Sequence, residues 1–301
     1  MNIKSLHFLL TYQCNFECDH CFVWGGPKAE GVMTLSYIRE IYEEAKKLGT
    51  VRRIYFEGGE PFLYFPIMIE GLREAKQRGF ETGIVTNGYW ATTLEDAIEW
   101  LRPIAEVGIN DLTVSDDSFH FKNGDNRAKH AVRAARELGL PIGTISIQEP
   151  QKYFKEIERG TKPVGGAVMF RGRAAEKLVR NLPKKSWKEF RKCVDEDFLN
   201  QSRVHLDPFG YVHLCQGIAM GNVKTEPLSK LIQSFDVRAH PICSPILERG
   251  PVGLVEVYDI PHEDVYVDEC HLCYSARLAL RKRFPECLTP DQMYGACPDC
   301  E

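Results

Sequence analysis

The 301-residue sequence has no apolar run long enough to cross a bilayer, which takes about 20 residues. Its first residues carry neither a charged amino-terminal region nor a small-residue cleavage site, so we expect no export signal. Basic residues are not in excess, since 38 Lys and Arg stand against 42 Asp and Glu and the net charge is −4. These absences predict a cytoplasmic protein that binds neither membranes nor nucleic acids.

Cysteine, by contrast, is abundant, with 11 residues and several C-x-x-C pairs. Without an export signal, such pairs favour metal binding over disulfides. Cys14, Cys18 and Cys21 follow a C-x3-C-x2-C spacing. A loop of that length can wrap three thiolates around a cubane iron–sulfur cluster and leave its fourth iron open. Zinc is the alternative because His20 lies between two of the thiols, although zinc favours C-x2-C pairs and four ligands.

Short apolar strands alternate with helical segments through the first half of the chain. We expect strands at 5–10, 53–57, 81–85, 111–115, 142–147 and 167–170, and helices at 34–49, 67–78, 94–107 and 126–138. Short βα connections imply parallel strands in right-handed crossovers. The pattern predicts an α/β fold, a partial (β/α)6 barrel with its chemistry at the carboxyl ends of the strands.

The stretch from Cys14 to Cys21 resembles the cluster loop of the radical S-adenosylmethionine (radical SAM) enzymes. In that family three cysteines hold a [4Fe-4S] cluster whose open iron binds SAM. An electron from a flavodoxin- or ferredoxin-type donor then splits SAM into methionine and a 5′-deoxyadenosyl radical. The resemblance covers roughly residues 5–150 and implies an oxidoreductase-like enzyme that takes hydrogen from a C–H bond.

Two further motifs at expected strand ends carry the same resemblance. Gly58-Gly59-Glu60 is similar to the family's GGE motif, which holds the methionine amine, and two glycines let a backbone approach a ligand closely. Ser115 and Asp117 resemble the S-x-D motif that contacts the ribose hydroxyls. Alone, a Gly-Gly-Glu sequence is an ordinary turn, but its place about forty residues after the cysteines favours the family motif.

The resemblance assigns three more SAM contacts. His20 takes the position of an aromatic residue that seats the adenine, and Asn87 points at the cofactor side. Arg127 stands where relatives often place an arginine for the methionine carboxylate, which a guanidinium suits. Each has a plainer interpretation, because Asn87-Gly88 is also a common turn and Arg127 also fits a helix surface.

The C-terminal region resembles the auxiliary-cluster extensions called SPASM and twitch. Residues 204–215 predict a hairpin around Pro-Phe-Gly, and a helix is expected at 275–283. The resemblance implies that Cys193, Cys215, Cys270 and Cys273 hold one auxiliary [4Fe-4S] cluster, as in a twitch domain. The C-x2-C-x5-C-x3-C run of a full SPASM is absent. We expect a radical SAM domain at 1–185 and a small cysteine-rich domain with a hairpin and helices at 186–301.

Four cysteines remain after this assignment: Cys243, Cys287, Cys297 and Cys300. A second auxiliary cluster on them has little support. Cys243 and Cys287 are equally well explained as buried apolar residues. Cys243 is also a weak candidate for donating a hydrogen atom to a substrate radical, and the terminal C-x-x-C pair could bind zinc, form a dithiol or do nothing.

Three functions stay open. The first is a maturase-type oxidation, crosslink or epimerisation of a peptide or protein residue, which members with such extensions often perform. Against it, the chain begins at the first barrel strand without a peptide-recognition domain. The second is a dehydrogenase or mutase of a polar small molecule, which the four-cysteine pattern favours. The third is a non-catalytic iron–sulfur protein, which would need no SAM motifs such as Glu60 and Ser115.

Overall fold

One eight-stranded sheet organises the computed structural model, which describes residues 1–121, 125–150 and 166–296. Its strand order is β11-β10-β9-β1-β2-β3-β4-β5, and strands β1 to β5 are parallel. The first five strands are β1 (Ser5–Thr11), β2 (Arg53–Gly58), β3 (Glu81–Thr86), β4 (Asp111–Ser115) and β5 (Ile142–Ile145). This is the predicted βα succession, and these strand bounds match the expected ones to within a few residues.

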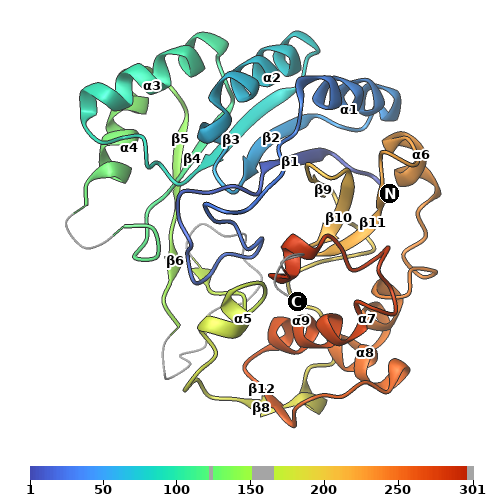
Figure 1. Cartoon of the computed structure of the whole chain (residues 1–301). Coiled ribbons are helices and arrows are strands. Elements are labelled where there is room, and N and C mark those ends of the chain that lie inside the picture. Colours follow the sequence, from blue (N-terminus) through green and yellow to red (C-terminus); the bar gives the residue numbers. More distant parts are fainter. Residues whose placement is uncertain (122–124, 151–165, 297–301) are drawn as a thin grey trace.

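Four helices cover one face of these strands (Figure 1). They are α1 (Leu35–Leu48), α2 (Phe65–Gln77), α3 (Leu94–Val107) and α4 (Arg127–Glu137), with a short 3₁₀ turn η1 (Pro61–Tyr64) before α2. Helix α1 begins where Thr34 accepts the Tyr37 N–H and ends at Gly49, whose φ of 66° suits glycine. Phe8 and Phe56 are fully buried against Tyr42 of α1 and Gly71 of α2. The apolar core therefore lies between the sheet and the helices.

The predicted fifth and sixth strands differ from the observed ones. β5 ends at Ile145, and β6 (Ile147–Gln148) pairs instead with β7 (Gly166–Ala167) in a separate two-stranded parallel ribbon. The Ile147 N–H donates to Asp117 Oδ2 at 3.1 Å, so it is not available to continue the ladder. The expected sixth strand at 167–170 is thus shorter than predicted and lies outside the main sheet.

The C-terminal hairpin continues the same sheet. Its strands are β9 (Arg203–Leu206) and β10 (Tyr211–Cys215), followed by β11 (Ile218–Asn222). β9 pairs in parallel with β1, with Ser5 opposite Arg203 and His7 opposite His205. The hairpin was predicted, but its union with the barrel sheet was not. The division of the chain at residue 185 stays a prediction.

The remaining C-terminal elements are α5 (Ala174–Lys177), β8 (Lys185–Ser186), η2 (Trp187–Glu189), α6 (Leu228–Ser234), α7 (Cys243–Arg249), α8 (Pro251–Tyr258), β12 (Val265–Tyr266), α9 (Glu269–Leu280) and η3 (Asp291–Tyr294). Of these elements, α6 lies beside α1, and most of the others lie on the side of the sheet opposite α1 to α4 (Figure 1). Helix α9 begins six residues before the predicted start at Ser275, because Asp268 caps it by accepting the His271 N–H. Among helices of the described ranges, none has the length and apolarity to span a bilayer.

A buried carboxylate ties the hairpin to β1. Asp207 Oδ2 accepts the Tyr12 hydroxyl at 2.8 Å and lies 3.1 Å from His213 Nε2. Its Oδ1 accepts the backbone N–H groups of Phe209 and Tyr211. Burial raises the pKa of Tyr12 well above its usual value, so this phenol stays a neutral donor. One side chain therefore pairs donors from two parts of the chain that are far apart in sequence.

We expect Asp207→Ala to lower the free energy of unfolding by about 3 kcal/mol or more. Each buried donor left without an acceptor costs about 1–3 kcal/mol, and several are released together. Urea unfolding of the metal-free chain, followed by circular dichroism, measures the change. The matched control is Asp236→Ala, since exposed Asp236 only accepts the Arg238 N–H and should matter by less than about 0.5 kcal/mol. Equal losses in both variants would contradict the expectation.

Candidate functional site

The loop with Cys14, Cys18 and Cys21 follows the carboxyl end of β1. It folds back on itself, because the Cys14 N–H donates to the Gly26 carbonyl and the Cys21 N–H to the Cys18 carbonyl, each at 3.0 Å. Arg173 fixes the loop from far along the chain. Its guanidinium donates to the carbonyls of Cys18 and Gly25, both at 2.8 Å. The three thiols therefore sit on a loop that is closed by hydrogen bonds.

Nitrogen donors surround two of these sulfurs. Cys14 Sγ accepts the Phe16 N–H at 3.4 Å and the Asn87 side-chain amide at 3.5 Å, and Cys21 Sγ accepts the Gly25 N–H at 3.2 Å. Burial raises the pKa of Cys14 to about 12, so its free thiol stays protonated and its thiolate needs a partner such as a metal. Donors of this kind stabilise thiolates that ligate an iron–sulfur cluster.

The spacing of the sulfurs separates zinc from a cluster. Within the described part of the chain, no three cysteine sulfurs lie all within 4.8 Å of one another. Thiolates around zinc, with bonds of about 2.3 Å, would lie roughly 3.8 Å apart. The three thiols do not form such a compact group, and thiolates are the ligands that a cubane iron–sulfur cluster takes.

The two glycines of Gly58-Gly59-Glu60 pack against the end of β1. A Cβ on Gly59 would lie 2.1 Å from the Gln13 carbonyl oxygen, and one on Gly58 would lie 2.4 Å from that of Thr11. The Gly59 and Glu60 N–H groups donate to these same two carbonyls at 2.7 and 2.8 Å. From the sequence we expect the two glycines to let the backbone come close to a ligand. In the structure they let the backbone after β2 come close to the backbone at the end of β1.

Glu60 lies fully buried beside this contact. Its Oε1 accepts the Phe62 N–H and the Thr86 hydroxyl, and its Oε2 accepts the Asn87 N–H at 2.7 Å. Burial raises the pKa of Glu60 to about 7 despite these donors. The carboxylate therefore joins the ends of β2 and β3, and only Oε2 has room for another donor.

Asn87 and Asp117 both lie near the cysteine loop. The Asn87 amide donates to Asn15 Oδ1 at 2.9 Å as well as to Cys14, so this side chain lies against the cysteine loop. Asp117 Oδ1 lies 2.8 Å from His120 Nδ1, and its Oδ2 accepts the Ile147 N–H. Ser115 is the last residue of β4, half-buried.

His20 and Arg127 are placed less directly. The His20 ring packs on Phe119 and His120 at centroid distances of 4.6 and 5.2 Å, and burial lowers the pKa of His20 to about 4. Its ring is therefore neutral, as an adenine-stacking group would be. Arg127 lies 3.4 Å from Asp125 and over the Phe121 ring. The structure brings every predicted SAM residue except Arg127 into hydrogen bonds or packing around the cysteine loop or the adjoining strand ends.

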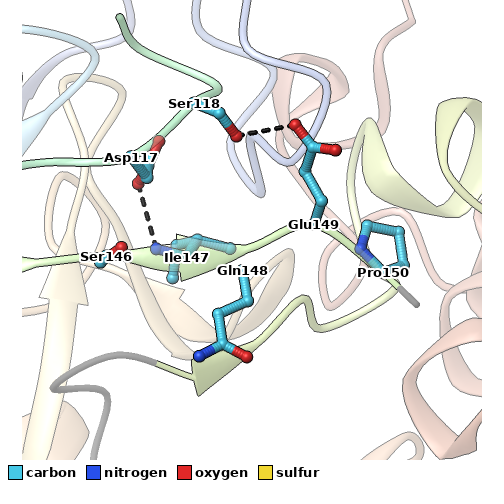
Figure 2. Close-up of a pocket in the computed structure, with 7 residues that line it drawn as sticks. All are labelled: Asp117, Ser118, Ser146, Ile147, Gln148, Glu149 and Pro150. Carbon is cyan, nitrogen blue, oxygen red and sulfur yellow. Dashed lines mark hydrogen bonds between the residues drawn. The ribbon is translucent and has the colours of Figure 1, made fainter. Parts of the chain in front are cut away.

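Figure 2 shows a pocket of about 520 Å³ beyond the carboxyl ends of β4 and β5. Its lining residues are Asp117, Ser118, Ser146, Ile147, Gln148, Glu149 and Pro150. Ser118 donates to Glu149 at 2.7 Å across the pocket. Sequence reasoning named Asp117 but missed the residues after Ile145, although the strand-end rule that found the other motifs applies to them equally.

The four cysteines predicted for the auxiliary site line one interior pocket. Cys193, Cys215, Cys270 and Cys273 share it with two buried arginines, Arg171 and Arg277. Arg171 donates to Cys215 Sγ at 3.0 Å, and its guanidinium also lies over the ring of Phe22, next to Cys21. Neither arginine was identified from the sequence, because one buried arginine among many charged residues leaves no local pattern.

Cys243 and Cys287 are not among the residues that line the pocket of the four cysteines. Cys243 is fully buried at the start of α7 and Cys287 is buried near it, as expected for apolar residues. Nothing places Cys243 near a substrate. Cys297 and Cys300 lie outside the described residues.

Comparison with known proteins gives one family. Residues 8–156 match the sequence profile of the Radical SAM superfamily. A tungsten-containing aldehyde ferredoxin oxidoreductase cofactor-modifying protein of Pyrococcus furiosus is 37% identical over 198 residues, 60% of this chain and 52% of that protein. The putative peptide biosynthesis protein YydG of Bacillus subtilis is 30% identical over 117 residues, 39% and 37% of the two chains.

A third relative and one solved structure complete the comparison. A SAM-dependent nucleotide dehydratase of a Fibrobacter species is 30% identical over 165 residues, 52% of this chain and 44% of that protein. The chain thus spans about half the length, or less, of these relatives. The crystal structure of BtrN with AdoMet and 2-DOIA has a TM-score of 0.53 at 16% identity and covers 82% of this chain and 88% of that one. At this identity the likeness shows a shared fold.

We expect Gly59→Ala to destabilise the chain by about 3 kcal/mol and to lower its iron content after reconstitution. The new methyl group would overlap the Gln13 backbone, which cannot move without shifting the cysteine loop. The control is Gly143→Ala in β5, where the nearest atom is 3.9 Å away and the change should cost less than about 0.5 kcal/mol. Urea unfolding and iron analysis measure both variants, and equal behaviour would show that the contact is not needed.

Proposed function

We propose that the chain is an enzyme of the radical SAM superfamily, whose sequence profile matches residues 8–156, and that it splits SAM reductively and takes a hydrogen atom from a substrate C–H bond. The observation that carries this proposal is the loop with Cys14, Cys18 and Cys21. Two of its thiols, Cys14 and Cys21, accept N–H donors, and the end of β1 that leads to the loop is bound by the Gly59 and Glu60 N–H groups. A flavodoxin- or ferredoxin-type protein would supply the electron.

The chain's residues would divide the binding of cofactor and SAM as follows. Cys14, Cys18 and Cys21 hold a [4Fe-4S] cluster, which together with bound SAM supplies a 5′-deoxyadenosyl radical when reduced. The Gly58 and Gly59 carbonyls and Glu60 Oε2 accept the methionine amine. Ser115 and Asp117 bind the ribose, His20 seats the adenine, Arg127 binds the methionine carboxylate, and Asn87 orients the loop at Cys14.

We also propose an auxiliary [4Fe-4S] cluster on Cys193, Cys215, Cys270 and Cys273. Its support is the convergence of these thiols on one pocket and the pair of buried guanidiniums, Arg171 and Arg277, beside them. A buried charge needs an opposite charge nearby. Glu196 lies 3.8 Å from Arg171, and four thiolates would add negative charge beside both arginines. A cluster with four protein ligands has no open iron, so its role would be to carry electrons rather than to bind substrate.

For the substrate we favour a residue of a peptide or protein. YydG, a relative at 30% identity over 117 residues, is named for peptide biosynthesis, and the P. furiosus relative is named for modifying a protein cofactor. A polar small molecule is the second candidate, because the sheet face opposite the helices carries polar side chains such as His7, Tyr55 and Asp111. A non-catalytic role is set aside, since the family is one of enzymes.

We expect the reconstituted protein with SAM and a low-potential reductant to form 5′-deoxyadenosine. Cys18→Ala should reduce that rate to background because a cluster with two thiolates is not retained. Cys287→Ala is the matched control and should keep the rate, since Cys287 lies outside the proposed ligand set. Anaerobic incubation followed by chromatography measures the product. The same rate in wild type and in Cys18→Ala would refute the function.

Removing two proposed auxiliary ligands should remove about four irons per chain and leave SAM cleavage without substrate intact. The variant is Cys270→Ala/Cys273→Ala, and the double variant Cys243→Ala/Cys287→Ala serves as control. Iron and sulfide analysis after anaerobic reconstitution gives the count. Unchanged iron in the first variant, or a loss of four in the control, would overturn the assignment of ligands.

A further inference from the structure

Three metal-ligating side chains from neighbouring strands meet on the sheet face opposite the helices. We call this the inner face, and it carries His7 of β1, Glu57 of β2 and His205 of β9. Successive side chains of a strand point to opposite faces of the sheet. Phe8 and Phe56 point to the helices, so the adjacent His7 and Glu57 point to the inner face. His7 and His205 are direct partners in the parallel β1–β9 pairing.

The donor atoms converge more closely than their hydrogen bonds explain. His7 Nδ1 lies 3.3 Å from Glu57 Oε2, and His205 Nε2 lies 3.0 Å from Glu57 Oε1. One atom from each residue lies within 4.8 Å of the other two. Yet His7 Nδ1 and Glu57 Oε1 are shielded from solvent and have no hydrogen-bond partner of acceptable geometry. Atoms aimed at a common point, rather than at one another, produce this pattern.

The charges fit a cation as well. Burial alone would raise the pKa of Glu57, but the adjacent His7 and His205 outweigh it and hold that pKa well below its usual value. Burial lowers the pKa of His205 to about 4, although Glu57 opposes the shift. Near neutral pH the carboxylate is charged while His205 is a neutral imidazole, the form that binds metals.

The surroundings hold the ligands in place. The His7 ring stacks on Tyr55 at a centroid distance of 4.6 Å, and the Tyr55 hydroxyl donates to Asp111 at 3.1 Å. A cavity of about 270 Å³ at the amino ends of β2, β3 and β4 reaches Tyr55 and Asp111. The side chains of His7, Glu57 and His205 keep exposed fractions of 15–18%, although the His7 Nδ1 and Glu57 Oε1 atoms themselves are shielded.

We propose that His7, Glu57 and His205 form a binding site for one divalent transition-metal ion with nitrogen and oxygen ligands. Two imidazoles and a carboxylate suit first-row divalent metals, and three protein ligands leave coordination positions open. A bare ion-pair cluster is the weaker explanation, because it leaves two buried polar atoms, His7 Nδ1 and Glu57 Oε1, without a hydrogen-bond partner. No cysteine belongs to the set, so the site is separate from both cysteine groups.

The position suggests a use that rests on the proposed function. Glu57 directly precedes Gly58-Gly59-Glu60, so a metal bound on the inner face would lie beneath the proposed SAM pocket. Its open positions would take a substrate with oxygen donors, such as a carboxylate, phosphate or hydroxyl. Substrate anchoring of this kind positions one C–H bond without contributing to the chemistry.

Binding is tested on the reconstituted, oxidised protein without turnover. Mn²⁺ is titrated in and its free form is followed by electron paramagnetic resonance, and a separate titration uses Co²⁺ with optical detection. We expect one tight site per chain, nitrogen couplings from imidazole in the Mn²⁺ spectrum, and no thiolate charge-transfer bands with Co²⁺. Glu57→Gln and His205→Phe should each weaken binding more than about tenfold, since even groups behind the ligands affect affinity by 10–100-fold.

The matched control is Glu81→Gln, which removes a carboxylate from the same inner face at its exposed amino end. It should bind both ions like wild type, and circular dichroism with cluster content checks that all variants fold. The proposal is overturned if wild type has no stoichiometric site for either ion, if Co²⁺ shows thiolate bands, or if both ligand variants bind normally. Metal binding without SAM cleavage would refute the proposed function and leave this site standing.

Discussion

The contact between the Gly58-Gly59 backbone and the carbonyls of Thr11 and Gln13 is the constraint on which the site depends. It extends the β1–β2 pairing past the ends of the strands. The segment that leads to Cys14 and the segment that leads to Glu60 are therefore held together. No side chain larger than hydrogen fits there. Glu60 links these segments to the end of β3, because its carboxylate accepts the Asn87 N–H. The Asn87 side chain in turn donates to Cys14 Sγ. The cysteine loop and the proposed SAM pocket therefore depend on the same backbone contacts.

A second set of contacts couples this unit to the C-terminal region. Asp207 joins Tyr12 to the hairpin, and β9 completes the sheet beside β1. Arg171 touches both Phe22 and Cys215, while Arg173 binds the carbonyls of Cys18 and Gly25. Two arginines that are two positions apart in the sequence thus contact both cysteine groups. The inner-face residue His205 also comes from this region, so the inner face of the sheet carries side chains from both halves of the chain.

The sequence predicted local structure well and long-range structure poorly. Periodicity and caps located β1 to β4 and α1 to α4, because strands and helices with strong alternation and Thr or Gly caps depend on nearby residues. The break after Ile145 was missed because it depends on Asp117, thirty residues earlier. The parallel β9–β1 pairing, Arg171, Arg277 and the His7–Glu57–His205 cluster were missed for the same reason. Both groups of thiols, by contrast, could be predicted from the cysteine spacing, because metal binding restricts which residue types can stand at those positions.

The hydrogen bonds of Arg173 have a consequence for biosynthesis. Cys14, Cys18 and Cys21 are synthesised before the groups that enclose them, which run from Asn87 to Arg173. The four thiols of the proposed auxiliary site are complete only when Cys273 has been synthesised. In a growing chain the three loop thiols would therefore lack their enclosing contacts until Arg173 has been made. Any iron–sulfur cluster that reached the loop before that point would be held without the hydrogen bonds from Arg173.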